Sequence, residues 1–165
     1  MPNYCNNQAT FVSDNPAIIK KIVNAANQEA VFDTFVPVEV SDNPISIWGC
    51  KWEASDIVVL AQDIHSVTLY FDTPWNPPIE FYQALEEQGI AVRAYYWEPG
   101  MAFCGRFDDG VDEEFPATEG EIPADIDAVF NINAQYEEWR VECMEDVERF
   151  IYEGQQTRQL EAEIG

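Results

Sequence analysis

Hydrophobic and polar residues alternate at the start of the chain and then recur at helical spacing. Residues 4–12 alternate as in a strand with one buried face. The string Ser13-Asp14-Asn15-Pro16 has the residues of a helix cap, with proline in the first turn. The apolar residues after it repeat every three or four positions, at Ile18, Ile19, Ile22, Val23 and Ala26. This part of the chain therefore predicts a strand followed by a helix.

The middle of the chain is rich in β-branched and aromatic residues, which predicts a sheet. We expect an irregular connection over residues 31–44, because its apolar residues are scattered and interrupted by two prolines. Strands are predicted at residues 45–52, 56–62, 66–72, 90–97 and 101–107. A second helix is predicted between residues 79 and 89, opened by Asn76-Pro77-Pro78 and closed by Gly89.

Beyond residue 107 the chain becomes strongly acidic. Residues 108–127 hold nine acids and no base, and we expect them to form a loop along the surface. A short edge strand is predicted at residues 128–132, and Asn133 is expected to cap a last helix that runs to about Glu153. One face of this helix is apolar and is expected to dock on the rest of the protein, through Tyr136, Trp139, Cys143, Val147, Phe150 and Ile151.

The order of these elements predicts an α+β fold. We expect a ferredoxin-like antiparallel sheet with two helices on one face, plus an acidic loop and a C-terminal helix. Residues 1–107 would form the ferredoxin-like domain. Residues 108–165 would supply the acidic loop, the edge strand and the amphipathic helix packed on that domain.

Four strings of residues stand in order along this chain. They are Met1-Pro2-Asn3-Tyr4-Cys5-Asn6-Asn7, then Trp48-Gly49-Cys50-Lys51-Trp52, then Thr73-Pro74-Trp75-Asn76-Pro77-Pro78, and finally Glu98, Gly100, Phe103 and Gly105. Together they resemble the Api92-like/YubB family of phage and plasmid proteins. The resemblance covers about residues 1–110 and implies a ferredoxin-like domain and a mobile-element origin, but no catalytic residues. The family often has Thr where this chain has Cys50, and the acidic last third is not part of the resemblance.

Several kinds of chemistry lack their residues in this sequence. The four cysteines lie far apart with no histidine at ligand spacing, so we expect buried free thiols and neither a metal nor a cofactor. His65 stands alone, and a surface position in a hairpin is expected for it. Phosphate-binding glycine motifs, a membrane span and a secretory signal are not recognisable, and we expect a cytoplasmic protein that is not an enzyme.

The charge of the chain points instead to binding. Thirty-one acids against eight bases give a net charge of −23, of which −15 falls on residues 108–165. Such a charge opposes direct binding to nucleic acid and destabilises the compact state by self-repulsion. The predicted last helix holds seven acids from Glu137 to Glu153. After subtraction of Arg149, the arginine on the same side of the helix, that is about one net charge per 4 Å, close to the 3.4 Å spacing of phosphates along one DNA strand.

These observations lead to one hypothesis and several alternatives. The hypothesis is a phage- or plasmid-encoded DNA mimic that occupies the basic channel of a host defence complex, such as a CRISPR effector or a restriction or recombination nuclease. The predicted binding residues are Asp108, Asp109, Asp112, Glu113, Glu114, Glu138, Glu142, Glu145 and Asp146. One alternative is a protein-interaction module that uses an aromatic patch from Trp48, Trp52 and Trp75, with acidity serving only solubility and steering. Another explanation of the charge is adaptation to high salt.

Overall fold

The computed structural model describes residues 3–164, which fall into two compact units. The first unit ends at Phe130 and the second begins at Asn131, whereas the sequence predicted a boundary after residue 107. Met1 and Pro2, which open the first of the four strings, lie outside the described residues.

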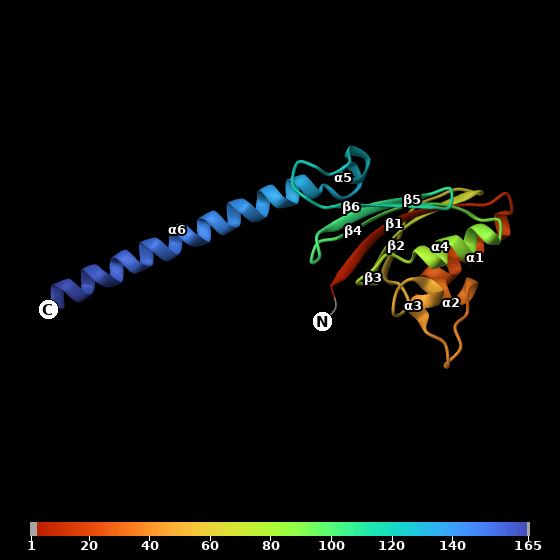
Figure 1. Cartoon of the computed structure of the whole chain (residues 1–165), viewed down its shortest axis with the longest axis horizontal. Coiled ribbons are helices and arrows are strands. Elements are labelled where there is room, and N and C mark those ends of the chain that lie inside the picture. Colours follow the sequence, from red (N-terminus) through yellow and green to blue (C-terminus); the bar gives the residue numbers. More distant parts are fainter. Residues whose placement is uncertain (1–2, 165) are drawn as a thin grey trace. The chain divides into compact units, whose positions relative to one another are not determined.

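The first unit contains a six-stranded antiparallel sheet with strand order β2-β3-β1-β4-β5-β6 (Figure 1). The strands are β1 (Tyr4–Val12), β2 (Ser55–Gln62), β3 (Ser66–Pro74), β4 (Ala91–Glu98), β5 (Phe103–Asp108) and β6 (Val111–Pro116). The first strand occupies an inner position because Ala9 pairs with Leu69 of β3 on one side and with Ala94 of β4 on the other. This confirms the predicted α+β class and its antiparallel sheet.

Helices cover the sheet unequally. The helices of this unit are α1 (Pro16–Asn27), α2 (Val31–Phe35), α3 (Pro44–Trp48), α4 (Ile79–Glu87) and α5 (Ala124–Phe130). Four of them, α1 to α4, lie on one face of the sheet, and α5 lies on the other (Figure 1). The predicted helices correspond to α1 and α4, and both lie on the same face as expected.

The core lies between the sheet and helices α1 to α4. Phe32 of α2 is fully buried at its centre, with its ring 4.4 Å from that of Phe81, 5.6 Å from that of Trp48 and 5.9 Å from that of Phe71. These four aromatic residues come from α2, α4, α3 and β3, so one cluster joins four elements. Truncation of such a side chain to alanine costs about 3–5 kcal/mol in protein cores.

Two short helices lie within residues 31–52, where an irregular connection and a strand were predicted, and residues 36–43 between them are irregular as expected. The first turn of α2 is held by Glu53, whose carboxylate accepts hydrogen bonds from the backbone N–H groups of Phe32 at 2.8 Å and Asp33 at 3.0 Å. Helix α3 is capped by the side chain of Asn43, which accepts from the N–H of Ile45 at 3.2 Å. The strand predicted at residues 45–52 was therefore wrong, because its first half is α3 and its second half is a loop.

The acidic segment is also ordered differently from the prediction. Residues 108–116 form the end of β5 and strand β6, joined by a turn in which Asp109 and Gly110 have φ values of 49° and 75°. The edge strand predicted at residues 128–132 was wrong, because residues 128–130 belong to α5 and Ile132 begins the next helix. In α5, Ile126 and Phe130 are buried, and the ring of Phe130 lies 6.3 Å from that of Trp97 in β4.

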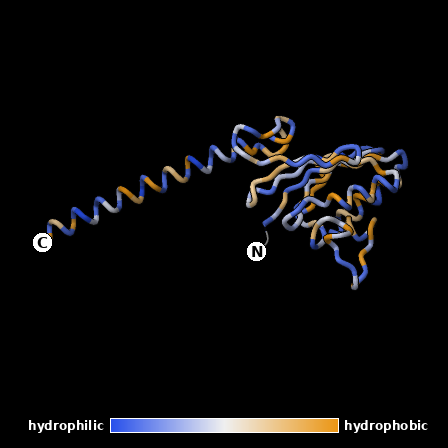
Figure 2. The backbone as a smooth tube through the Cα atoms, viewed as in Figure 1, coloured by the Kyte–Doolittle hydropathy of each residue, from blue (hydrophilic) through white to orange (hydrophobic). Residues whose placement is uncertain are grey.

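The second unit is one long helix, α6 (Ile132–Ile164), of 33 residues. It begins one residue before the predicted cap at Asn133 and continues 11 residues beyond the predicted end at Glu153. Figure 2 shows hydrophobic and hydrophilic segments alternating along it. Every described side chain from Glu137 to Ile164 is exposed.

Candidate functional site

The acids predicted to form one binding surface lie on two different structures. Five belong to the hairpin of β5 and β6, and four belong to α6. Successive side chains of a strand point to opposite faces of the sheet, so acids that follow one another in β6 are separated. Side chains of a helix three or four residues apart lie on one face instead.

Three of the five hairpin acids have partners inside the first unit. Asp108 forms an ion pair with Arg93 at 3.1 Å, and Glu113 forms one with Arg106 at 2.7 Å. Asp112 accepts a hydrogen bond from the hydroxyl of buried Tyr96 at 2.8 Å. These contacts neutralise or occupy the carboxylates, so residues 108–114 do not form the single array that was predicted.

Arg106 explains why this hairpin keeps its acids close to the sheet. Its guanidinium donates to Glu113 at 2.7 Å and to Asp125 of α5 at 2.8 Å, and it lies 5.4 Å from the ring centre of Phe115. Hydrogen bonds to Glu113 and then Asp125 raise the pKa of Arg106 above its usual range. Arg106 thus links β5, β6 and α5.

Asp109 and Glu114 are the remaining hairpin acids, and both are exposed. Asp109 has a left-handed backbone in the two-residue turn Asp109-Gly110, which is a common sequence for a tight hairpin. Asp109 is thereby explained by the turn. Among the five hairpin acids, Glu114 is the one whose acidic side chain is explained neither by a contact described above nor by the turn.

The four predicted acids on α6 are brought together by the helix. At about 100° per residue, they lie within an arc of about 100°. They are Glu138, Glu142, Glu145 and Asp146. All seven acids from Glu137 to Glu153 lie within about half of the circumference, which we call the acidic half of α6. Asp146 forms an exposed ion pair with Arg149 at 3.2 Å, and exposed pairs of this kind contribute little to stability.

The length of α6 changes the electrostatic argument for these acids. In a helix ending near residue 153, Glu148 and Glu153 would oppose the helix dipole in the last turn. Because α6 continues to Ile164, both residues are interior and the dipole acts weakly on them. Repulsion between Glu138 and Glu142, four residues apart, remains.

The other half of α6 is mostly apolar and exposed, with Arg140 among its residues. Its side chains include Trp139, Cys143, Met144, Val147, Phe150 and Ile151. Phe150 is 77% exposed and Val147 58%. The expectation that all four cysteines are buried was therefore wrong for Cys143, whereas Cys5, Cys50 and Cys104 are buried. Burial raises the pKa of Cys50 to about 12 and that of Cys104 to about 11, so these thiols are protonated at neutral pH.

The three tryptophans of the predicted aromatic patch divide between core and surface. Trp48 is buried, and its indole N–H donates to the carbonyl of Val36 at 2.8 Å. Trp52 and Trp75 are each 39% exposed, with ring centres 5.4 Å apart in an edge-to-face arrangement. The ammonium of Lys51 lies 5.9 Å from the ring centre of Trp52 and 5.6 Å from that of Trp75.

Backbone strain accompanies this exposed aromatic pair. Trp75 has φ of 62° and Ala102 has φ of 55°, in the region that favours glycine. Both line a groove of about 430 Å³, together with Met101 and Phe103. Strained residues of this kind occur often at binding sites, so the groove beside Trp75 is a second candidate surface.

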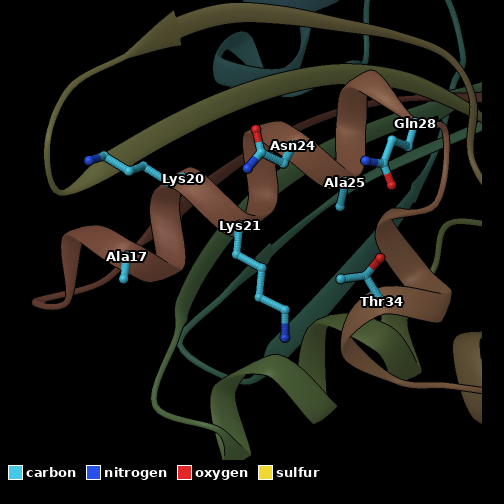
Figure 3. Close-up of a pocket in the computed structure, with 7 residues that line it drawn as sticks. All are labelled: Ala17, Lys20, Lys21, Asn24, Ala25, Gln28 and Thr34. Carbon is cyan, nitrogen blue, oxygen red and sulfur yellow. The ribbon is translucent and has the colours of Figure 1, made fainter.

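A smaller hollow lies between α1 and α2. It has a volume of about 300 Å³ and is lined in part by Lys20, Lys21, Gln28 and Thr34 (Figure 3). The two lysine side chains extend in different directions, so their charges do not converge on one ligand. Among residues 3–164, no group of three or more His, Cys, Asp or Glu side chains is arranged to hold a metal ion. No helix in the same range is long and apolar enough to cross a membrane.

Comparison with known proteins identifies the domain. Residues 47–128 match the family model described as the ferredoxin-like domain in Api92-like protein. Residues 47–128 therefore form a domain of the Api92-like family. The match begins in α3 and ends in α5, so it includes three of the four strings that suggested the family and leaves out β1 and α1. It confirms the predicted ferredoxin-like fold.

One solved structure adds a weaker likeness. Protein api92 from Yersinia pseudotuberculosis is 24% identical over 52% of this chain and 33% of its own, with a TM-score of 0.36. The chain thus spans about a third of the length of that protein, and the TM-score is too low for a comparison of the two folds. No curated protein matches the chain.

Proposed function

We propose that this Api92-like chain is a non-catalytic DNA mimic encoded by a phage or plasmid. The acidic half of α6 would occupy the basic channel of a host nucleic-acid-binding defence complex in the bacterial cytoplasm. A CRISPR effector and a restriction or recombination nuclease have channels of this kind. Lysine and arginine side chains of the target would donate charge-assisted hydrogen bonds to the carboxylates and so exclude nucleic acid.

One observation carries this proposal: the seven acids from Glu137 to Glu153 share half of an exposed, continuous helix. A helix keeps its side chains in fixed order, so the carboxylates form a row about 24 Å long. Like charges four residues apart, such as Glu138 and Glu142, destabilise a helix by a few tenths of a kcal/mol. A row of charges that is locally unfavourable and exposed to solvent is typical of a surface kept for binding.

The proposal is narrower than the one the sequence suggested. It rests on Glu138, Glu142, Glu145 and Asp146, which share one arc of α6, whereas Asp108, Asp112 and Glu113 are held at the sheet by contacts with other strands of the first unit. We assign the hairpin acids to the stability of the sheet edge. Charged residues on an edge strand also hinder pairing with other chains.

Competition with DNA tests the proposal. The immobilised chain is incubated with bacterial lysate at low salt, and bound proteins are eluted with duplex DNA and identified by mass spectrometry. The purified protein is then assayed for DNA binding with increasing amounts of the chain. We expect the wild-type chain to displace DNA, and the fourfold variant with Glu138, Glu142, Glu145 and Asp146 replaced by lysine to lose this effect.

A matched variant separates position from total charge. Replacing Asp14, Glu29, Glu39 and Glu87 by lysine changes the net charge equally, and all four are exposed in the first unit. The proposal requires this control variant to inhibit nearly as well as the wild type. Equal loss of inhibition in both variants would mean that only the net charge matters, and the proposal would be wrong.

The exposed aromatic pair supports a second candidate function. Trp52 and Trp75, with Lys51 above both rings and a groove beside Trp75, would form the contact surface of a protein-interaction module. In that case the Trp52→Ala and Trp75→Ala variants would lose the captured partner. The fourfold lysine variant of α6 would only bind it more slowly, because charge would then serve steering alone.

A further inference from the structure

The apolar half of α6 is as regular as its acidic half. Tyr136, Trp139, Cys143, Val147 and Phe150 follow one another at intervals of three or four residues. With Met144 and Ile151 they occupy an arc of about 140°, opposite the acids, and Arg140 is the charged residue within this arc between Tyr136 and Ile151. We call this set the apolar stripe.

The exposed fractions show how much of the stripe faces solvent. Trp139 is 43% exposed, Met144 59%, Val147 58%, Phe150 77% and Ile151 52%. From Tyr136 to Ile151 the stripe is about 22 Å long at 1.5 Å per residue. Isolated exposed apolar residues need no explanation, but a contiguous row of this length usually marks an interaction site.

Duplex DNA presents phosphates along a polar backbone, so a basic channel alone gives no role to this stripe. We propose that the partner of α6 is a protein with an apolar groove rimmed by lysine and arginine, in which α6 lies as an amphipathic helix. The groove would take the apolar stripe, and its rim would bind the acidic half. This inference rests on the proposed function, since it names the kind of basic surface that α6 fits.

Charge decides between this partner and other occupants of the stripe. An anionic lipid surface would repel the seven acids that flank it. A second copy of the chain would bring together two molecules with a net charge of −23 each. A protein groove with a basic rim satisfies both halves of the helix at once, in the manner of other helix-in-groove complexes.

Two synthetic helical peptides test the inference with the full-length chain. Both contain only leucine and lysine in equal proportions: in one the leucines form a stripe at helical spacing, and in the other the order is scrambled. Fluorescence anisotropy measures their binding at low salt. We expect the striped peptide to bind at least about tenfold more tightly than the scrambled one, because only it offers an apolar face beside its charges.

Two matched double variants locate the contact. Trp139→Gln with Phe150→Gln alters the apolar stripe, whereas Val141→Gln with Tyr152→Gln alters exposed apolar residues in the acidic half. The stripe variant should lose at least about tenfold in affinity for the striped peptide, since buried Trp and Phe anchors dominate such contacts, and the control less than about threefold.

The outcomes separate this inference from the proposed function. Equal binding of both peptides, abolished by the fourfold lysine variant, would overturn the inference and leave the proposed function standing. Binding of neither peptide would overturn both. A lower thermal midpoint of the stripe variant in the absence of peptide would show that the chain itself covers the stripe. A dimer by light scattering that the stripe variant abolishes would show that a second copy covers it. Either result would overturn the inference.

Discussion

Asp112 offers a sharp test of the assignment of hairpin acids to stability and not to binding. The hydroxyl of Tyr96 donates to its carboxylate at 2.8 Å, and Tyr96 is fully buried. Asp112→Ala leaves this hydroxyl without its acceptor, which costs about 1–3 kcal/mol. In a chain of this size each kcal/mol lowers the thermal midpoint by about 2–4 °C, so we expect a decrease of roughly 2–12 °C.

The neighbouring acid provides the control for this experiment. Glu114 is exposed in the same strand, and Glu114→Ala should change the free energy of unfolding by less than about 0.5 kcal/mol, which is less than about 2 °C in the midpoint. Circular dichroism during heating measures both variants, and the DNA-competition assay is repeated with each. Midpoints that are equal for the two variants, or a loss of inhibition by Asp112→Ala at a temperature where it is folded, would refute the assignment.

Two further predictions concern the stability of the first unit. Gly105→Ala would place a methyl group 2.2 Å from the ring of Tyr96, so it should destabilise the protein by about 1–3 kcal/mol in urea unfolding. The control is Gly154→Ala in α6, where the added methyl group meets no atom within 4 Å, and this variant should raise the helix content. Partial burial raises the pKa values of Glu53 and Asp112 above their usual range, so the folded state holds these protons more tightly than the unfolded state. The stability that these protons contribute is lost as pH rises from about 4 through the raised pKa values of the folded state. The urea midpoint should therefore be higher at pH 5 than at pH 7.5, and a higher midpoint at pH 7.5 would contradict this prediction.

The sequence predicted the strands and helices whose signals are local. The alternation of residues 4–12 matches β1, and the predicted strands at 56–62 and 66–72 match β2 and β3 to within two residues at each end. The helix signal at Asn15-Pro16 is confirmed, since the side chain of Asn15 accepts from Ala17 N–H at 3.0 Å. These elements are specified by the residues within them.

One error had a signal in the sequence. Ser41-Asp42-Asn43-Pro44 repeats the string Ser13-Asp14-Asn15-Pro16, and in both places the asparagine caps a helix with proline in its first turn. Gly49, with φ of 90°, ends the second of these helices. The aromatic and β-branched residues between Pro44 and Gly49 suggested a strand, although the capping residues on either side of them indicated a helix.

Other features depend on contacts between distant residues. Helix α2 is held by Glu53, about 20 positions away, and nothing in residues 31–35 indicates this partner. The ion pairs that occupy Asp108 and Glu113 require the register of β4, β5 and β6, which no single segment determines. The acidic half of α6 could be predicted because a helix places its residues by spacing alone.

The salt dependence of partner binding tests the central claim most directly. The affinity of the chain for the protein that duplex DNA displaces is measured at 50 mM and 300 mM salt, with the wild type and the fourfold lysine variant of α6. The account predicts that the wild-type affinity falls at least about tenfold over this range, because exposed charges are screened, and that the variant does not bind. An affinity that is unchanged by salt, or retained by the variant, would contradict it.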